Sequence, residues 1–361
     1  MDSQNPTHLF SPLKIKSLTL RNRIGVSPMC EYSSEDGTAT DWHLVHLGSR
    51  AVGGAGLVMA EATAVTANGR ISPGDACIWA DKHIEPIARI NRFIRLHGAV
   101  PGIQIAHAGR KASAALPWEG GEQLSDDAGG WPTIAPSALA FGAKLQKVPR
   151  AMNEADIARV QSEFVAAAKR ALTAGTEWLE LHFAHGYLAH EFLSPLSNHR
   201  TDGYGGSFEN RIRFALEITQ KVRAVWPDKF PLAARLSCTD WMDGGWDIEQ
   251  SIELSRRLKS IGVDLIDCSS GALVPQAVVP MAPGFQVPFA ERIRREAKIA
   301  TAAVGCITEP THADEIIRNG RADIVFLARE LLRDPYWPRR AAEVLGHKDL
   351  LPPPVQYRRA W

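Results

Sequence analysis

Residues 178–211 read WLELHFAHGYLAHEFLSPLSNHRTDGYGGSFENR, and this stretch carries the strongest indication of fold and chemistry. It opens as an apolar strand with one acid inside it and then sets down His182, His185 and Tyr187 in quick succession. A buried strand that ends in polar side chains is typical of a β/α barrel, which presents catalytic groups at the C-terminal rim. Two imidazole N–H donors and a phenol can bind a carbonyl oxygen and protonate beside it. A His-x-x-His metal half-site and hydrogen-bonded core histidines remain alternatives.

Short apolar runs alternate with longer amphipathic runs along the rest of the chain. Eight strand-then-helix units, with several strands apolar on both faces, predict a closed parallel eight-fold β/α (TIM) barrel of the α/β class. The strands are expected at 23–27, 56–60, 102–106, 178–183, 232–237, 264–268, 301–304 and 323–327. The helices are expected at 42–52, 84–97, 154–174, 209–225, 248–261, 289–297, 311–319 and 335–345. No linker or charge block divides the chain, which predicts one domain over 1–361.

Two segments depart from this alternation. Segment 112–149, after the third strand, is too long for a plain connection and is rich in Gly, Pro and Trp. We expect an excursion over the rim, either a substrate lid or a capping subdomain. The last residues, 350–361, contain three consecutive prolines, which prevent helix there and favour an extended arm.

Composition excludes several classes of protein. A chain of 361 residues, 45% hydrophobic, suits a single barrel. The formal net charge of +1 argues against nucleic acid or an anionic membrane as the main partner. The 5 cysteines are scattered without a CxxC pair, which is typical of reduced thiols in a cytoplasmic protein. The N-terminal MDSQNPTHLF has no apolar core, so no signal peptide is expected.

Five further segments and the closing VQYRRAW carry a family resemblance together with 178–211. They are NRIGVSPMCEYSS (22–34), EATAVTANGRI (61–71), GIQIAHAGRKAS (102–113), DLIDCSSGAL (264–273) and RADIVFLARELLRDPYW (321–337). Over essentially its whole length the chain resembles the old yellow enzyme family of FMN-dependent ene-reductases, in its bacterial thermophilic-like and xenobiotic-reductase class. The resemblance implies FMN as cofactor, NADPH as reductant and a role in detoxification.

The same resemblance implies a reaction. NADPH reduces the flavin by hydride transfer and departs, and an electron-poor alkene then takes its place in a ping-pong cycle. Enones, enals, maleimides and nitroalkenes are the substrate classes. His182 and His185 would bind the carbonyl or nitro oxygen, and Tyr187 would protonate the alkene carbon.

The end of the first strand carries the first set of expected flavin contacts: Ser27, Pro28, Met29 and Cys30. Pro28 lacks a ladder donor and ends the strand, which leaves the following backbone and thiol facing the rim. A thiol is a weak donor and a soft neighbour for an electron-rich ring. The resemblance implies that Cys30 adjusts the flavin redox potential and that Tyr32 lines the substrate pocket.

Flavin also needs hydrogen bonds at its pyrimidine edge and a positive charge near N1, because the reduced ring is anionic. Ala62 offers backbone, Gln104 an amide and Arg235 the cation, all near strand ends. From the residues alone, two alternatives stay open: the Gln104 amide is bound to backbone, and Arg235 forms an ion pair inside the barrel. We expect Lys111 to orient the substrate or the Arg235 region.

The phosphate is expected at the loops after the seventh and eighth strands, as in many barrels. The residues there are Gly305, Cys306, Ala328 and Arg329. Relatives commonly carry Gly where this chain has Ala328. The backbone N–H of Ala328 can still donate to the phosphate if its φ is negative, as is usual for alanine. Ser270 and Gly271 are expected to close the ribityl side.

The resemblance also implies a homodimer or a dimer of dimers with exchanged C-terminal arms. Arg359 would reach the partner's substrate pocket, with Trp361 as an aromatic wall. Three other functions remain open at this point: a flavin-free barrel lyase or isomerase that binds a substrate phosphate, a metal hydrolase that adds His190 or Glu191 to the histidine pair, and a non-catalytic binding protein. Our expectation is that no metal is bound.

Overall fold

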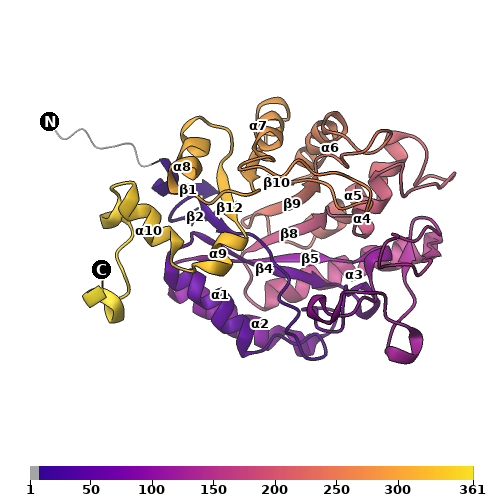
Figure 1. The fold of residues 1–361 in the computed structure, drawn as a ribbon, viewed down its shortest axis with the longest axis horizontal. Helices are drawn as coiled ribbons and strands as arrows, with labels where there is room; N and C mark the ends of the chain where they lie inside the picture. Colours follow the sequence, from indigo (N-terminus) through magenta and orange to yellow (C-terminus); the bar gives the residue numbers. More distant parts are fainter. Residues whose placement is uncertain (1–7, 361) are drawn as a thin grey trace.

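The computed structural model describes residues 8–360, and within them eight parallel strands close into a barrel ringed by helices (Figure 1). In sequence order the strands are β3 (Ile24–Val26), β4 (Leu57–Ala64), β5 (Val100–Ala106), β8 (Trp178–Phe183), β9 (Leu232–Ser237), β10 (Leu265–Ser269), β11 (Ala300–Ala303) and β12 (Ile324–Leu327). Each pairs with the next, and β12 pairs with β3 to close the ring. The predicted TIM barrel is confirmed. β4 runs past its expected end because a bulge between Ala60 and Ala62 keeps it paired with β5.

The helices cover the outside of the barrel, and local capping sets their ends. They are α1 (Asp41–Gly53), α2 (Ile84–Leu96), α3 (Glu154–Thr173), α4 (Leu188–Leu193), α5 (Phe208–Arg223), α6 (Ile248–Ser260), α7 (Val287–Glu296), α8 (Pro310–Arg318), α9 (Arg329–Arg333) and α10 (Trp337–Val344). The Asn153 side chain accepts the Asp156 N–H at 2.9 Å and begins α3. Gly262, with φ of +96°, ends α6. The short α4 and α9 follow strand ends directly and were not expected as separate helices.

A hairpin closes the N-terminal end of the barrel. Strands β1 (Leu13–Ile15) and β2 (Leu18–Leu20) pair antiparallel and pack against an apolar cluster in the lower barrel. That cluster includes Trp178 and Phe326, and a Cβ at Gly25 would lie 2.2 Å from the Phe326 ring. The floor of the barrel is therefore filled by side chains. Two three-residue strands are too short to show a period, which is why sequence analysis missed them.

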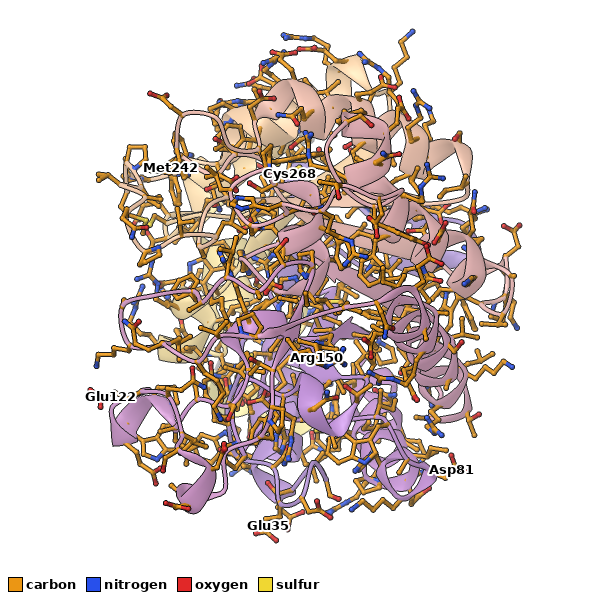
Figure 2. All side chains as sticks on the ribbon, turned by 90° about the vertical axis from the view of Figure 1, so that its right-hand side faces the viewer. Glu35, Asp81, Glu122, Arg150, Met242 and Cys268 are labelled. Atoms are coloured by element: carbon orange, nitrogen blue, oxygen red, sulfur yellow. The ribbon has the colours of Figure 1, made fainter. Side chains whose placement is uncertain are left out.

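The excursion 112–149 contains short turns of 3₁₀ helix and little regular sheet. The 3₁₀ turns of the chain are η1 (His8–Phe10), η2 (Ala67–Gly69), η3 (Asp81–His83), η4 (Gly109–Lys111), η5 (Pro117–Glu119), η6 (Asp126–Ala128), η7 (Lys348–Leu350) and η8 (Val355–Ala360). The two-residue strands β6 (Ile134–Ala135) and β7 (Arg150–Ala151) pair in parallel at its end. In Figure 2, Glu122 of the excursion and Met242 of the loop after β9 lie along the same edge of the molecule.

The C-terminal arm differs from expectation. Val355–Ala360 forms the 3₁₀ helix η8 and not an extended segment. Within the arm, only the prolines at 352–354 lack a backbone N–H, so the residues after them can form helical hydrogen bonds. The Tyr357 N–H donates to the Pro354 carbonyl at 2.9 Å. All of η8 is exposed, and Figure 1 shows it at the left edge, far from α4 on the right. Trp361 lies outside the described residues. Across residues 8–360 we find no helix with the length and apolar character needed to cross a membrane.

Candidate active site

The end of β8 brings His182, His185 and Tyr187 together. The His182 ring centroid lies 5.1 Å from that of His185 and 5.1 Å from that of Tyr187, with nearly perpendicular planes. A tight turn makes this possible, because His185 and Gly186 have φ of +61° and +69°. A Cβ at Gly186 would lie 2.3 Å from the Ala272 carbonyl oxygen, so the turn accepts only glycine there.

The two histidines have different hydrogen bonds. His182 Nδ1 accepts the Ala184 N–H at 3.3 Å, so its proton is on Nε2, which binds no other described residue. His185 Nε2 lies 2.7 Å from the Ser269 hydroxyl. The His185 backbone N–H donates to the Ser237 hydroxyl at 2.9 Å, which fixes the turn. His182 thus offers a free N–H donor, whereas His185 is held by the end of β10.

The protonation states favour hydrogen-bond donation. Enclosure in the protein lowers the pKa of His182 and of His185 well below the ordinary value, and the nearby Arg235 charge adds to this. Both imidazoles are therefore neutral near pH 7. Enclosure raises the pKa of Tyr187 well above its ordinary value, so the phenol keeps its proton.

Lys111 connects this turn to the loop after β10. Its Nζ donates to the carbonyl oxygens of His185 at 2.9 Å and Ala272 at 3.2 Å, and it lies 4.9 Å from the centroid of the Tyr187 ring. Desolvation lowers the pKa of Lys111 to about 8. The structure thus places this lysine against the His185–Gly186 turn and the Tyr187 ring.

The loop after β3 presents Cys30 and Tyr32 at the same rim. Burial raises the pKa of the Cys30 thiol well above its ordinary value, and the Glu61 charge adds to this, so the group stays a thiol. The Tyr32 ring packs edge-on to Trp118 of the excursion at 6.2 Å. Glu61 holds the loop, since it accepts the Glu31 N–H at 3.0 Å.

Four polar side chains form a layer inside the barrel next to His182, which is paired with Arg235 in the strand register: Gln104, Glu180, Arg235 and Asp267. Gln104 Nε2 donates to Glu180 Oε1 at 2.7 Å, so this amide is tied to a side chain and not to backbone. Arg235 Nε lies 3.1 Å from Asp267 Oδ2, the ion pair that sequence analysis left open, and its Nη1 donates to the Ser27 hydroxyl at 3.3 Å.

Sequence analysis missed Glu180 and Asp267. The sequence does contain an indication of both residues. Glu180 is the single acid in the strand WLELHF, and Asp267 is the single acid in the strand LIDCS. Glu180 also precedes His182 by two residues, which places both side chains on one face of β8. An inward acid below a rim histidine is a sign of function in a barrel strand.

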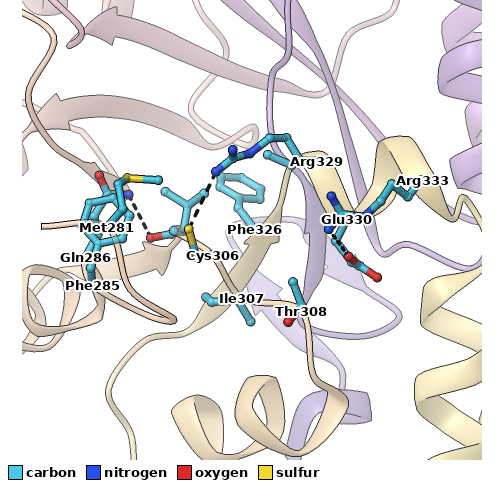
Figure 3. A pocket seen from close by; sticks show the side chains of 13 residues that line it. Met281, Phe285, Gln286, Cys306, Ile307, Thr308, Phe326, Arg329, Glu330 and Arg333 are labelled. Carbon is cyan, nitrogen blue, oxygen red and sulfur yellow. Dashed lines mark hydrogen bonds and ion pairs between the residues drawn. The ribbon is translucent and has the colours of Figure 1, made fainter. Parts of the chain in front are cut away.

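The loops after β11 and β12 line a cavity of about 250 Å³ (Figure 3). Its lining includes the four expected phosphate contacts, Gly305, Cys306, Ala328 and Arg329. Ala328 has φ of −106°, so alanine is accommodated without left-handed strain. An Arg329 Nη2 lies 3.7 Å from Cys306 Sγ. Among residues 8–360, no backbone acceptor pairs with the N–H groups of these four residues.

Gln286 connects this cavity to the histidine pair. It lines the cavity, donates to the Val304 carbonyl at 2.9 Å and accepts from the Ser270 hydroxyl at 2.7 Å. Ser269, one residue earlier, contacts His185. The Gly271 N–H pairs with the Thr239 carbonyl at 2.8 Å, so this turn supports the loops and its φ of +71° suits glycine.

This donor set fits FMN. A flavin ring needs amide-like partners and a cation near N1, and a phosphate needs backbone N–H donors with a fixed positive charge. Arg235 is only 6% exposed, and its Nε lacks a well-aligned hydrogen bond despite the nearby Asp267. Gln104 would supply the amide, and Arg329 with the unpaired N–H groups would supply the phosphate site.

The residues suggested for a metal hydrolase lie in other contacts. His190 Nε2 lies 3.0 Å from Asp240 Oδ1, and its Nδ1 accepts the Gly186 N–H at 2.9 Å. Glu191 accepts the Arg110 N–H at 2.8 Å. In the described part of the chain, no three His, Cys, Asp or Glu side chains converge as metal ligands. His190 supports the His185–Gly186 turn and does not complete a ligand set with His182 and His185.

Comparison with known proteins identifies the family. The model of the NADH:flavin oxidoreductase / NADH oxidase family matches residues 8–348. The chain is 50% identical over 357 residues to the NADPH dehydrogenase of Geobacillus sp. (strain WCH70), covering 98% of this chain and 99% of the relative. The NADPH dehydrogenase of Bacillus subtilis (strain 168) is 49% identical over 355 residues, covering 98% and 99%. An old yellow enzyme homologue of Zymomonas mobilis matches with a TM-score of 0.77 and 27% identity, over 93% of this chain and 92% of that one. The chain therefore belongs to the NADH:flavin oxidoreductase / NADH oxidase family, as an FMN-dependent enzyme of the old yellow enzyme type that takes its electrons from NAD(P)H.

Proposed function

We propose that this enzyme uses NADPH to reduce electron-poor C=C bonds in small molecules, in a ping-pong cycle. Enones, enals, maleimides and nitroalkenes are the substrate classes, and detoxification in the cytoplasm is the physiological role. The observation that carries the proposal is a pair of neutral imidazoles beside a protonated phenol at one strand end. This set can bind an oxygen and supply a proton without any change in net charge before the reaction.

The cofactor would be held along the rim from β3 round to β12. At the ring we place the loop of Ser27, Pro28, Met29 and Cys30, with Ala62, Gln104 and Arg235. At the ribityl and phosphate groups we place Ser270, Gly271, Gly305, Cys306, Ala328 and Arg329. When bound, FMN supplies the two-electron chemistry, since it accepts hydride from NADPH and passes hydride to an alkene.

The protein's own groups act on the alkene. The Nε2–H of His182 and the His185 imidazole donate to the carbonyl or nitro oxygen, which stabilises the enolate charge as it develops. Tyr187 holds the proton for the alkene carbon. Tyr32 lines the pocket beside Trp118 of the excursion, and Lys111 orients both the His185 turn and the Tyr187 ring.

A simple experiment tests the proposal. Purified protein should be yellow, should bleach when NADPH is added anaerobically, and should regain its colour when cyclohexenone is added. Colourless protein that cannot be reconstituted with FMN contradicts the proposal. So does reduced enzyme that cyclohexenone, maleimide and nitrostyrene all fail to reoxidise.

Replacing Tyr187 with phenylalanine should slow reoxidation by cyclohexenone by about 10²- to 10⁴-fold, the range for loss of a general acid. Reduction by NADPH should keep its rate, because Tyr187 gives up no proton in that half-reaction. The pH profile adds a second check. The histidine pKa values lie well below the ordinary value and that of Tyr187 well above it, so the wild-type rate should be flat from about pH 6 to about pH 7.5. An inflection at about pH 6.5 that disappears in His182→Ala would contradict this.

Replacing Cys30 with alanine should leave the protein yellow and folded but shift the midpoint potential of its flavin. The raised pKa keeps Cys30 a thiol, which makes it a polarisable neighbour and a poor nucleophile. Both half-reactions should persist at altered rates in stopped-flow measurements. A trapped adduct between Cys30 and substrate, together with complete loss of alkene reduction, would instead establish covalent catalysis.

The C-terminal arm completes the proposed site from a neighbouring subunit, in a homodimer or a dimer of dimers. Its residues 355–360 are exposed, and Tyr357 contacts only Tyr336 among the aromatic rings of the described residues, at 6.1 Å. An exposed terminus with Tyr357, Arg358 and Arg359 is well suited to docking on another chain. Arg359 would reach the partner's pocket, and Trp361 would add an aromatic wall.

A further inference from the structure

The polar layer inside the barrel is built by four neighbouring strands. Gln104 on β5 is level with Glu180 on β8, and Arg235 on β9 is level with Asp267 on β10. Their exposed fractions are 2% for Gln104, 0% for Glu180, 6% for Arg235 and 0% for Asp267. Below them the apolar cluster around Trp178 fills the barrel and excludes water from that side. The layer therefore faces only the rim, where the cofactor would sit.

This layer contains unpaired polar atoms. Glu180 Oε2 and Asp267 Oδ1 are buried without a hydrogen-bond partner among the described residues, and Arg235 Nε and Asp267 Oδ2 lie 3.1 Å apart without a well-aligned hydrogen bond. Buried polar atoms are normally paired, and exceptions often mark a functional group. Two carboxyl groups also face a single guanidinium, so the layer carries a net negative charge if both ionise. One of the two carboxyl groups can therefore hold a proton.

The charges that act on the two carboxyl groups are few. Burial raises the pKa of Glu180 to about 8, and the Asp267 charge adds to this, while Arg235 opposes it. Burial raises the pKa of Asp267 to about 6, against the lowering effect of Arg235. His182, above Glu180 on β8, is neutral. On the two flanking strands, the positions paired with Gln104 and Asp267 are the uncharged Ala62 of β4 and Ala302 of β11.

Glu180 controls the orientation of Gln104. An ionised carboxylate only accepts hydrogen bonds, so it binds the Gln104 NH₂ and leaves the amide oxygen to accept from another donor. A protonated Glu180 can instead donate to the Gln104 oxygen, which lets the NH₂ group face the rim. Asp267 acts on Arg235, because the carboxylate charge neutralises part of the guanidinium charge.

We propose that Glu180 and Asp267 are positioning residues for FMN, and that a proton held by this carboxyl pair sets the charge of Arg235 and the orientation of Gln104 toward the cofactor. The inference rests on the proposed roles of Gln104 and Arg235. Reduced FMN is anionic, so the pair takes up a proton when the cofactor is reduced and releases it when the cofactor is reoxidised. The two carboxyls titrate as a pair, and the uptake belongs to both.

The test is the two-electron midpoint potential of bound FMN, measured from about pH 6 to about pH 9. Asp267→Asn leaves the Arg235 charge without its counter-ion, so it should favour reduced over oxidised FMN by about tenfold above about pH 7, where Asp267 is ionised in the wild type, and by less at the acidic end. That factor corresponds to about 30 mV for a two-electron couple. Glu180→Gln should match the wild type at the acidic end, where Glu180 is protonated. At the alkaline end, the wild type should lose about tenfold in this preference relative to Glu180→Gln.

Controls separate this role from a structural one. Asp264→Asn removes a carboxylate at the opposite end of β10, where it pairs with Lys16 at 3.5 Å, and should leave the potential curve unchanged. Thermal melting shows whether each variant is folded, and the conservative Gln and Asn replacements keep the side-chain volume.

The potential measurements distinguish failure of this inference from failure of the proposed function. A wild type that binds no FMN overturns both proposals. A wild type that NADPH reduces but no alkene reoxidises overturns only alkene reduction, and its potential curves still test the carboxyl pair. Curves for Glu180→Gln and Asp267→Asn that run parallel to the wild type, with no offset at any pH, overturn the positioning role alone.

Discussion

Replacing His182 with alanine should slow reoxidation of the reduced enzyme by cyclohexenone by about a hundred- to a thousandfold. Loss of one oxyanion donor has this effect in other enzymes. His185→Ala should cost less, about ten- to a hundredfold, because His185 Nε2 is already engaged by Ser269 at 2.7 Å while His182 Nε2 is free to donate. The order of the two effects follows from the hydrogen bonds and not from the sequence.

Stopped-flow spectroscopy measures the rate of reoxidation of each variant. The amount of bound FMN shows whether the cofactor site is intact. FMN content and the rate of reduction by NADPH should both stay at wild-type values. His199→Ala is the matched control, because His199 is exposed beyond α4 and should keep full activity. If either variant of the pair lost a stoichiometric zinc ion instead, the histidines would be metal ligands, and the hydrolase interpretation would replace ours.

Deleting residues 356–361 should lower alkene turnover by about tenfold or more and weaken substrate or NADPH affinity, while FMN stays bound. A charged hydrogen-bond donor lost from a binding site has an effect of this size. Residues 355–360 are exposed and lie at the opposite side of the molecule from α4 in Figure 1. Removal of the arm should therefore leave the melting temperature of the subunit nearly unchanged.

Complementation gives the sharper version of this experiment. An arm-deleted subunit is mixed with a subunit that carries both His182→Ala and His185→Ala. In the mixed dimer, the intact arm of one chain meets the intact pocket of the other, so activity should return although each parent is impaired. If mixing restores nothing and the deleted form alone is fully active, the arm does not complete a neighbouring site.

Much of the fold follows from local patterns. Each barrel strand is a short apolar run bounded by turn residues, and helix α3 begins where the Asn153 cap allows it. The positions of the eight strands could therefore be predicted, and with them the rim residues that follow each strand. The tight turn at His185 and Gly186 could be expected only as a turn, because its left-handed backbone depends on packing against Ala272.

Local patterns could not show which polar groups pair. Gln104 and Glu180 are 76 residues apart, and Arg235 meets Asp267 only through the register of β9 with β10. A one-residue change in register would turn these side chains to the outer face, so their pairing is a property of the closed barrel. The Ser269 contact of His185 arises in the same way. Residue types near strand ends thus indicate a flavin-dependent reductase from sequence, whereas the charge balance beneath its cofactor exists only once the strands are assembled, because it depends on distances between side chains that are remote along the chain.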